Sequence, residues 1–511
     1  MIKERKVGIK LNLKFFKNVS ILTLIGMLIK VIGAIYRVPL TQIIGNEGNG
    51  YYGSAHNIYT MILLISSTSI PMAVSKLLSS QKFKKEEKQE VFQCMIIYAF
   101  VFGFLGSSIC FLFAPIFTLG NPNAIPVLRM FAPTIFFSAI MGTFRGYFQS
   151  KREMKPTAFS QLFEQLANAC FSVGCSYLLI KLTSNSIWGA VGAAVGPFMG
   201  VLFGCMYLIF LYRKHHLSWQ KESYCDHRMI YRSLFFTIIP MVLSTLIHNV
   251  GSTIDMTMFY NIEQWKGQAY EELNAWYGIY SGQFLVLYHV PTALATSISV
   301  AIMPMISGNR KGDQIKHTKE AFQLTCTFLL PCMIGFMFLS RTIISVLFPQ
   351  DPSSELLSAQ FLFFGSIGLF GTCFTTLSTT ILQGLNYMKA PVKNMAIALS
   401  VQSIMNLCLF LFTDFGIYVF LISTITFSAM TFLLNFHTLS QAIAWKPLLL
   451  SSLKYPLIGN IVMLLYLICV YNLNRIVSFS ELFYLCIQMI GSIVIYGGIQ
   501  FFLQKKSFRM H

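Results

Sequence analysis

The stretch that decides the fold is residues 26–40, which read Gly-Met-Leu-Ile-Lys-Val-Ile-Gly-Ala-Ile-Tyr-Arg-Val-Pro-Leu. Its two glycines and two cations are spaced by three or four residues, so on a helix they share one face: Gly26, Lys30, Gly33 and Arg37. The residues between them are aliphatic. A charge at bilayer depth costs roughly 2.5–3.5 kcal/mol on insertion scales, so Lys30 and Arg37 should face a protein interior or a watery cavity. The stretch therefore predicts a membrane helix that lines an anion-attracting cavity.

Two further features bear on this helix. Pro39 lacks a backbone donor, so it can kink the helix two residues after Arg37. The glycines on the cationic face have an alternative explanation, which is close packing against another helix. A loop rich in glycine follows at 45–53, and a second apolar run then ends near Lys76.

The composition places the whole chain in a membrane. Of its 511 residues, 55% are hydrophobic and only 11% are charged, whereas soluble domains carry about 25% charged residues. The twelve cysteines lie mostly in apolar runs without paired spacing, which indicates small packing residues rather than a disulfide framework. We expect no cleavable signal, because the basic N-terminal run leads into a full-length hydrophobic segment.

About twenty apolar residues span a bilayer, and the hydrophobic runs divide into fourteen candidates. They are roughly 19–44, 51–79, 91–115, 125–149, 157–181, 187–212, 233–260, 276–307, 321–347, 356–386, 393–413, 415–440, 449–473 and 480–503. We therefore predict an all-α polytopic membrane protein with about 14 transmembrane helices.

The positive charges test this division. If alternate loops are cytoplasmic, starting with the N-terminus, those loops and both termini hold 29 of the 38 Lys and Arg residues. The opposite loops hold only Lys181, Lys266 and Arg475, with Arg341 near an outer end. This is the positive-inside pattern, so we expect a plasma-membrane protein with both termini in the cytoplasm. The formal charge of +19 thus reflects topology, and we expect no nucleic-acid partner.

A weak internal echo predicts two lobes. Gly50-Tyr-Tyr-Gly53 resembles Ala275-Trp-Tyr-Gly278, and Arg145-Gly146 resembles Gln383-Gly384, each pair six predicted helices apart. The predicted organisation is two pseudo-symmetric six-helix lobes plus two extra C-terminal helices. Its parts are an N-lobe at 1–212, a cytoplasmic linker at 213–232, a C-lobe at 233–441, and the extra helices with a basic tail at 442–511.

Few charges lie inside the predicted spans. These charges are five cations and two carboxylates: Lys30, Arg37, Lys76, Arg129 and Arg145, and Glu164 and Asp255. All but Asp255 lie in the first lobe. A positive excess inside a membrane is costly unless water or an anionic ligand offsets it. We therefore expect an anionic head group to bind in this lobe.

Each charge also has a structural explanation. Lys76 and Arg129 lie near helix ends and could reach the interface. Arg145 and Glu164 should lie at similar depth and could simply pair with each other. Asp255 could act in gating or ion coupling, or could cap a helix near the outer end.

One polar stripe accompanies Glu164. Its spacing fits a wet helix face, and it comprises Gln161, Glu164, Gln165, Asn168 and Ser172. Asp255 belongs to a second stripe with Ser244, His248 and Gly251.

Other chemical motifs are missing from the sequence. A cluster in the predicted linker fits no standard zinc pattern and is better explained as a basic linker: His215, His216, Cys225 and His227. The sequence contains neither a G-x-x-x-x-G-K-[ST] loop nor an H-E-x-x-H motif. We therefore expect no metal, no cofactor, no nucleotide and no catalytic residues.

The motifs resemble one known family. The segments that carry the resemblance are Lys30–Pro39, Gly45–Tyr52, Ile70–Lys76, Phe144–Gln149, Pro156–Gln165 and Val290–Pro304. They are similar to the multidrug/oligosaccharidyl-lipid/polysaccharide exporter superfamily, and most closely to its polysaccharide-transporter branch of sporulation proteins and MurJ-type lipid II flippases.

This resemblance implies a two-lobed carrier that works by alternating access. It implies that a cationic cavity binds the diphosphate of an undecaprenyl-linked sugar, which places Lys30, Arg37 and Lys76 in the site, with Arg145 as a further candidate. The family also uses charged residues on its eighth helix, where this chain has only Gln283 and His289. Driving forces left open are the membrane potential, H+ and Na+.

Two other functions stay open at this point. A cation-coupled multidrug exporter of the same superfamily would favour acidic groups in its cavity. A membrane-embedded glycosyltransferase or polymerase usually presents catalytic residues in sizeable loops, and these loops are short. We favour a flippase and expect no enzyme activity.

Overall fold

The computed structural model describes most of the chain. Residues outside the described part are 1, 65–66, 68–69, 80–86, 119–120, 152, 216–248, 307–310, 444–445, 478 and 509–511. Within helices, the backbone but not the side chain is described at residues 2–25, 27, 30, 215, 300–301, 304–305, 311–313, 446–452 and 504–508.

The described residues form helices and contain no β-strand. Ten of these helices are long and apolar enough to cross a membrane, and each of the fourteen predicted runs falls on helical residues. The run at 233–260 is described only from residue 249. The prediction of an all-α polytopic membrane protein is confirmed.

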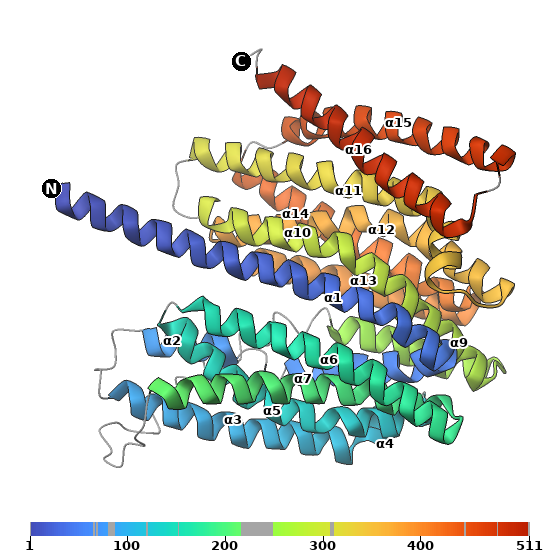
Figure 1. The fold of residues 1–511 in the computed structure, drawn as a ribbon, viewed down its shortest axis with the longest axis horizontal. Helices are drawn as coiled ribbons and strands as arrows, with labels where there is room; N and C mark the ends of the chain where they lie inside the picture. The colour runs from blue at the N-terminus through green and yellow to red at the C-terminus, as the bar shows by residue number, and fades with distance from the viewer. Residues whose placement is uncertain are drawn as a thin grey trace. The chain divides into compact units, whose positions relative to one another are not determined.

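The helices divide into two compact units, Met1–Gly278 and Ile279–His511 (Figure 1). The first contains α1 (Ile2–Leu63), α2 (Ile70–Ser79), α3 (Glu87–Leu112), α4 (Ala114–Phe117), η2 (Pro122–Ala124), α5 (Ile125–Ser150), α6 (Met154–Thr183), α7 (Ser186–His215), a helical stretch at 249–265, and most of α9 (Tyr270–Ile279). The second contains η3 (Tyr280–Phe284), α10 (Leu285–Ile306), α11 (Lys311–Leu347), α12 (Pro352–Gly384), α13 (Lys389–Phe412), η4 (Gly416–Tyr418), α14 (Val419–Ala442), α15 (Lys446–Val477) and α16 (Glu481–Phe508). The predicted boundaries of the two lobes and of the linker at 213–232 stay predictions.

Helix α1 contains two legs that meet at Gly45. Gly45 has φ 68° and ψ 178°, a conformation open essentially to glycine alone. A straight helix would separate the Cα atoms of Arg37 and Tyr52 by about 22 Å, at about 1.5 Å per residue. Their side chains nevertheless touch, with Arg37 Nη2 3.4 Å from the Tyr52 hydroxyl. The chain therefore bends sharply at Gly45, between the first two predicted spans, and the kink expected at Pro39 is not where the helix breaks.

Side chains on both sides of Gly45 stabilise this bend. The Asn49 amide donates to the Gly45 carbonyl at 2.7 Å and to the Thr41 carbonyl at 3.3 Å. Both Thr41 and Asn49 are buried. These bonds tie the second leg of α1 to the end of the first across Gly45.

A row of glycines joins α7 to α6, and the contact between these two helices is extensive. An added Cβ would lie within 3.2 Å of an α6 atom at every position of the row: Gly192, Gly196, Gly200 and Gly204. Four-residue spacing puts these glycines on one face of α7. Without side chains there, the two backbones approach closely, as is common between membrane helices.

The two echo motifs lie against each other at one end of the first unit. A Cβ on Gly50 would lie 2.1 Å from the Asn274 carbonyl oxygen, and one on Gly278 would lie 1.8 Å from the Asn46 carbonyl oxygen. The second leg of α1 thus packs backbone to backbone against α9. The Asn274 side chain accepts hydrogen bonds there from Tyr260 at 3.0 Å and Asn121 at 2.5 Å.

In the second unit, α12 packs against α10, α11 and α14, and α13 packs against α14. The two C-terminal helices pack against α11 and each other. The Tyr496 hydroxyl of α16 donates to the Thr327 carbonyl of α11 at 2.8 Å. Helix α12 begins with a capped turn, because Asp351 accepts hydrogen bonds from the Ser353 hydroxyl and from the Ser354 amide at 3.0 Å.

Candidate functional site

Arg37 lies on the first leg of α1 and is partly buried. Its guanidinium carbon is 4.7 Å from the ring centre of Tyr52 and 5.9 Å from that of Tyr36. Among the described residues, no carboxylate lies within salt-bridge distance of Arg37. The cation is therefore held by the rings and hydroxyl groups of two tyrosines rather than by a carboxylate.

The aromatic support extends along the second leg of α1. The Tyr52 ring stacks on His56 at 5.7 Å and contacts Phe131 of α5 at 5.5 Å. Tyr59 stacks on the same Phe131 at 4.6 Å. Tyr52, Tyr59 and Phe131 are buried, so this cluster fixes the orientation of the Tyr52 ring under Arg37.

The other predicted cations lie in different settings. The backbone of Lys30 belongs to α1, and its side chain lies outside the described part. Lys76 is exposed in the last turn of α2. Arg129 is exposed on α5, with its Nε 3.4 Å from the Phe111 carbonyl oxygen and its guanidinium 5.4 Å from the Phe111 ring. The positions of Lys76 and Arg129 fit the interfacial explanation, and the binding role of Lys30 and Lys76 stays a prediction.

Arg145 and Glu164 form an ion pair between α5 and α6. Arg145 Nη2 is 2.6 Å from Glu164 Oε2, and Arg145 Nε donates to the Ser160 hydroxyl at 3.0 Å. The Arg145 side chain is 14% exposed and that of Glu164 is 30% exposed. The charge of Arg145 is therefore neutralised within the fold, so the pairing alternative fits the geometry. A role in binding for Arg145, or in gating for Glu164, stays a prediction.

The polar stripe of α6 has two different parts. Gln161, Glu164, Gln165 and Asn168 are partly exposed. Ser172 is fully buried, and its hydroxyl oxygen lies 3.0 Å from the Asn168 side-chain oxygen and 2.9 Å from the Ala193 carbonyl oxygen of α7, either of which can accept its one proton. The stripe is therefore partly exposed from Gln161 to Asn168 and buried at Ser172.

The accessible half faces α1. The Asn168 amide nitrogen lies 3.4 Å from the Tyr36 hydroxyl. The Gln165 amide nitrogen lies 3.1 Å from where a Cβ on Gly33 would be. Gly33 thus gives room to a polar side chain of a neighbouring helix, which fits the close-packing explanation of that glycine. Arg37, Tyr36 and the two amides form one polar cluster, which we call the α1–α6 cluster.

Residues expected near the second half of the site are placed differently. Asp255 is buried, 5% exposed, in the stretch 249–265, while Ser244 and His248 lie outside the described residues. Gln283 is buried in the π-helical turn η3, where it exchanges hydrogen bonds with Gln350 at 3.0 and 3.2 Å. Ser358 donates to the same amide at 2.7 Å. The Gln283 amide therefore makes its hydrogen bonds within its own unit. An ion-coupling role for Asp255 stays a prediction.

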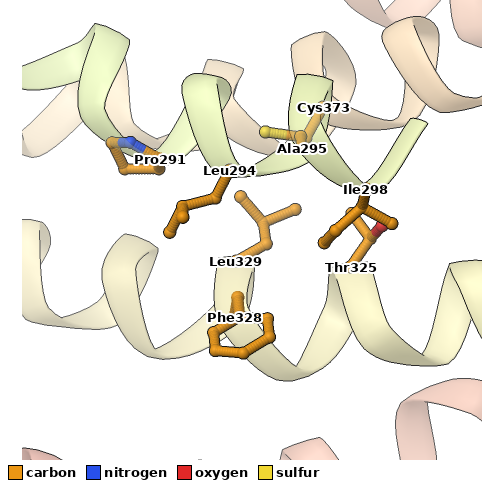
Figure 2. Close-up of a pocket in the computed structure, with 8 residues that line it drawn as sticks. All are labelled: Pro291, Leu294, Ala295, Ile298, Thr325, Phe328, Leu329 and Cys373. Atoms are coloured by element: carbon orange, nitrogen blue, oxygen red, sulfur yellow. The ribbon is translucent and has the colours of Figure 1, made fainter. Parts of the chain in front are cut away.

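The second unit contains a small apolar pocket between α10, α11 and α12 (Figure 2). Its volume of about 10 Å³ is at most that needed for one water molecule, which excludes a lipid head group. Its lining residues are Pro291, Leu294, Ala295, Ile298, Thr325, Phe328, Leu329 and Cys373. In the described part of the chain, no group of three or more His, Cys, Asp or Glu residues could hold a metal ion. His216, Cys225 and His227 lie outside that part.

A family model described as polysaccharide biosynthesis protein matches residues 15–309, more than half of the chain. The chain belongs to that family. Its multi-pass architecture is that of a membrane protein.

Individual relatives agree with this assignment. The lipid II flippase MurJ of Bacillus subtilis (strain 168) is 26% identical over 425 residues, which is 77% of each chain. A solved lipid II flippase MurJ in an inward closed conformation matches with a TM-score of 0.72 at 15% identity, over 95% of this chain and 99% of that one.

The fold extends to multidrug transporters. An inward-facing multidrug resistance MATE family transporter of the MOP superfamily matches with a TM-score of 0.61 at 12% identity, over 80% of this chain and 98% of that one. The resemblance inferred from the motifs is confirmed. These relatives are flippases and transporters rather than enzymes.

Proposed function

We propose that this protein is a flippase that moves an undecaprenyl-diphosphate-linked saccharide precursor of the cell envelope from the inner to the outer leaflet. It would work by alternating access in the plasma membrane, with both termini in the cytoplasm. The family assignment and the similarity to a lipid II flippase support this class of cargo.

The observation that carries the proposal is the state of Arg37. It is a partly buried cation without a carboxylate partner among the described residues, in contrast to Arg145. A guanidinium binds phosphate oxygens through paired hydrogen bonds, so an arriving diphosphate would supply the missing negative charge. Lys30 lies seven residues before Arg37, on the same predicted face as Gly33 and Arg37, and would add a second cation.

The driving force follows from the charge of the cargo. With the cell interior negative, each negative charge that moves outward gains about 2.3 kcal/mol per 100 mV. A diphosphate could thus be driven by the membrane potential alone, which agrees with the lack of a P-loop motif in the sequence. A coupled ion would add to this force.

Transport assays with paired arginine variants test the proposal. The full-length protein is placed in vesicles with a fluorescent undecaprenyl-diphosphate disaccharide, and the outward movement of the label is followed with a membrane-impermeant quencher. We expect Arg37→Ala to abolish transport and the matched change Arg129→Ala to leave it intact, because Arg129 is exposed at the edge of α5. Full transport by Arg37→Ala, at normal protein abundance, would contradict the proposed site.

A further inference from the structure

The α1–α6 cluster contains uncharged groups whose hydrogen-bonding capacity is only partly used. Gln165 is partly buried, yet the part of the chain that the structure describes offers its amide no hydrogen-bond partner. The Asn168 amide nitrogen reaches the Tyr36 hydroxyl only at 3.4 Å, beyond the usual 2.7–3.2 Å range. An amide and a phenol that are partly withdrawn from water lose free energy when they lack partners, so these groups suit a ligand.

The fold leaves room for both amides beside α1 and α7. The Ser172 hydroxyl lies 3.0 Å from the Asn168 side-chain oxygen, and the Asn168 nitrogen lies on the α1 side, 3.4 Å from the Tyr36 hydroxyl. Gly196 of α7 leaves room for this arrangement, because its Cβ would lie 2.7 Å from the Asn168 side-chain oxygen. On the α1 side, Gly33 leaves room for the Gln165 nitrogen. Both α1, at Gly33, and α7, at Gly196, therefore have a glycine where an amide of α6 lies against them.

Tyr36 links the cation to the Asn168 amide, and these groups offer different chemistry. Tyr36 precedes Arg37 in the chain, and its ring centre is 5.9 Å from the guanidinium carbon. An amide can donate two hydrogen bonds and accept two, and a phenol can donate and accept. Such neutral groups match sugar hydroxyl and acetamido groups, whereas phosphate favours the charged guanidinium.

We propose that Tyr36, Gln165 and Asn168 recognise the saccharide of the cargo through hydrogen bonds, while Arg37 binds its diphosphate. This inference rests on the proposed flippase function and adds to it the side chains that discriminate between sugars. It places sugar recognition on the seam between α1 and α6 of the first unit.

The test compares two cargoes in vesicles that contain the full-length protein. One cargo is undecaprenyl diphosphate without a sugar, and the other is the same lipid with an N-acetylated disaccharide. The variant Gln165→Met/Asn168→Leu keeps side-chain size but removes the amides. We expect the ratio of disaccharide-lipid to sugar-free-lipid transport to fall about tenfold, since a hydrogen bond contributes on the order of a factor of ten in binding. Arg37→Ala should abolish the transport of both cargoes, because both carry the diphosphate.

Two further variants sharpen the comparison. Gly33→Ala should lower the ratio in the same direction by a smaller factor, because the added methyl crowds Gln165. Gln441→Met, an exposed glutamine at the end of α14, is the matched control and should leave the ratio unchanged. An equal loss of both cargoes, or no loss, in the double variant would overturn the inference while leaving the flippase function standing. If the unaltered protein moves neither cargo, the flippase function itself fails.

Discussion

Glu164 accepts a hydrogen bond from Arg145 at 2.6 Å, and this contact joins α5 to α6. Arg145 holds its position with a second bond to Ser160. The two residues of the pair lie on either side of the short loop between these helices, so the pair closes the hairpin as well as neutralising a membrane cation. Its energetic role can be separated from transport by mutation.

Removal of one partner of this pair should destabilise the protein more than removal of both. In Glu164→Leu the Arg145 charge is left partly buried without its carboxylate, at a cost of roughly 1–3 kcal/mol, below the fully buried range because Glu164 is partly exposed. The double variant Arg145→Met/Glu164→Leu should recover about 1 kcal/mol or more of that loss. The measurement is a double-mutant cycle of unfolding free energies in detergent. Strict additivity would show that the pair contributes no coupling.

Replacement of Gly45 by alanine should destabilise α1 through the backbone alone. An added Cβ would meet nothing within 4 Å, but the φ of 68° costs an L-residue about 1–3 kcal/mol. Gly26→Ala is the control, since Gly26 also has open space around it and lies within the regular first leg. Thermal unfolding should therefore show a lower midpoint for Gly45→Ala only. Equal midpoints would mean that the bend relaxes without strain.

Bulk on the glycine row of α7 should separate α7 from α6. In Gly196→Ala the methyl would lie 1.9 Å from the Ser172 hydroxyl oxygen and 2.6 Å from the Asn168 backbone carbonyl oxygen, so the two helices must move apart. We expect a loss of about 1–3 kcal/mol, as is typical when a packed core receives an extra methyl group. Gly174→Ala on α6, where nothing lies within 4 Å, should be neutral or stabilising. Unfolding in detergent measures both, and a neutral Gly196→Ala would contradict the close packing.

The cap of α12 predicts a dependence on pH. Hydrogen bonds from Ser353 and Ser354 favour the ionised carboxylate and lower the pKa of Asp351 to about 2, from an ordinary value of 3.8. Because the pKa falls on folding, the cap stabilises the protein fully above about pH 4, and this stabilisation disappears as the pH drops toward 2. Asp351→Ala should cost about 0.5–1 kcal/mol at neutral pH. Its melting temperature should approach that of the unaltered protein near pH 2–3, and a difference independent of pH would contradict the role of the charge.

The sequence allowed the membrane fold to be predicted because hydropathy and loop charges follow from the bilayer itself. Span boundaries were also accessible, since the helix break at Gly45 falls between the first two predicted runs. The prediction of a loop over the whole of 45–53 was wrong, because every residue there except Gly45 is helical. Pro39 lies inside the helical first leg and does not end the helix, and a kink there stays a prediction. A proline is tolerated in a membrane helix where neighbouring groups satisfy the freed carbonyl.

The site was only partly predictable. The spacing of the α6 stripe indicated a polar face, but periodicity cannot show that Ser172 is dry and Gln165 accessible. Nor could it distinguish Arg37, which lies on the Tyr52 ring, from Arg145, which is paired, because partners come from other helices. The glycine row at 192–204 has a visible four-residue period that could have predicted the close contact between α6 and α7.

The same glycine row constrains how the first unit can deform. At its glycine row, α7 contributes no side chains to the contact with α6, so no rotamers can rearrange there. We therefore expect α6 and α7 to move together as one rigid body. The seam between α1 and α6 is built instead from long polar side chains such as Tyr36 and Gln165, which can change partners at little cost. Any sliding during the proposed transport cycle should therefore concentrate between α1 and α6, where we propose that the cargo binds.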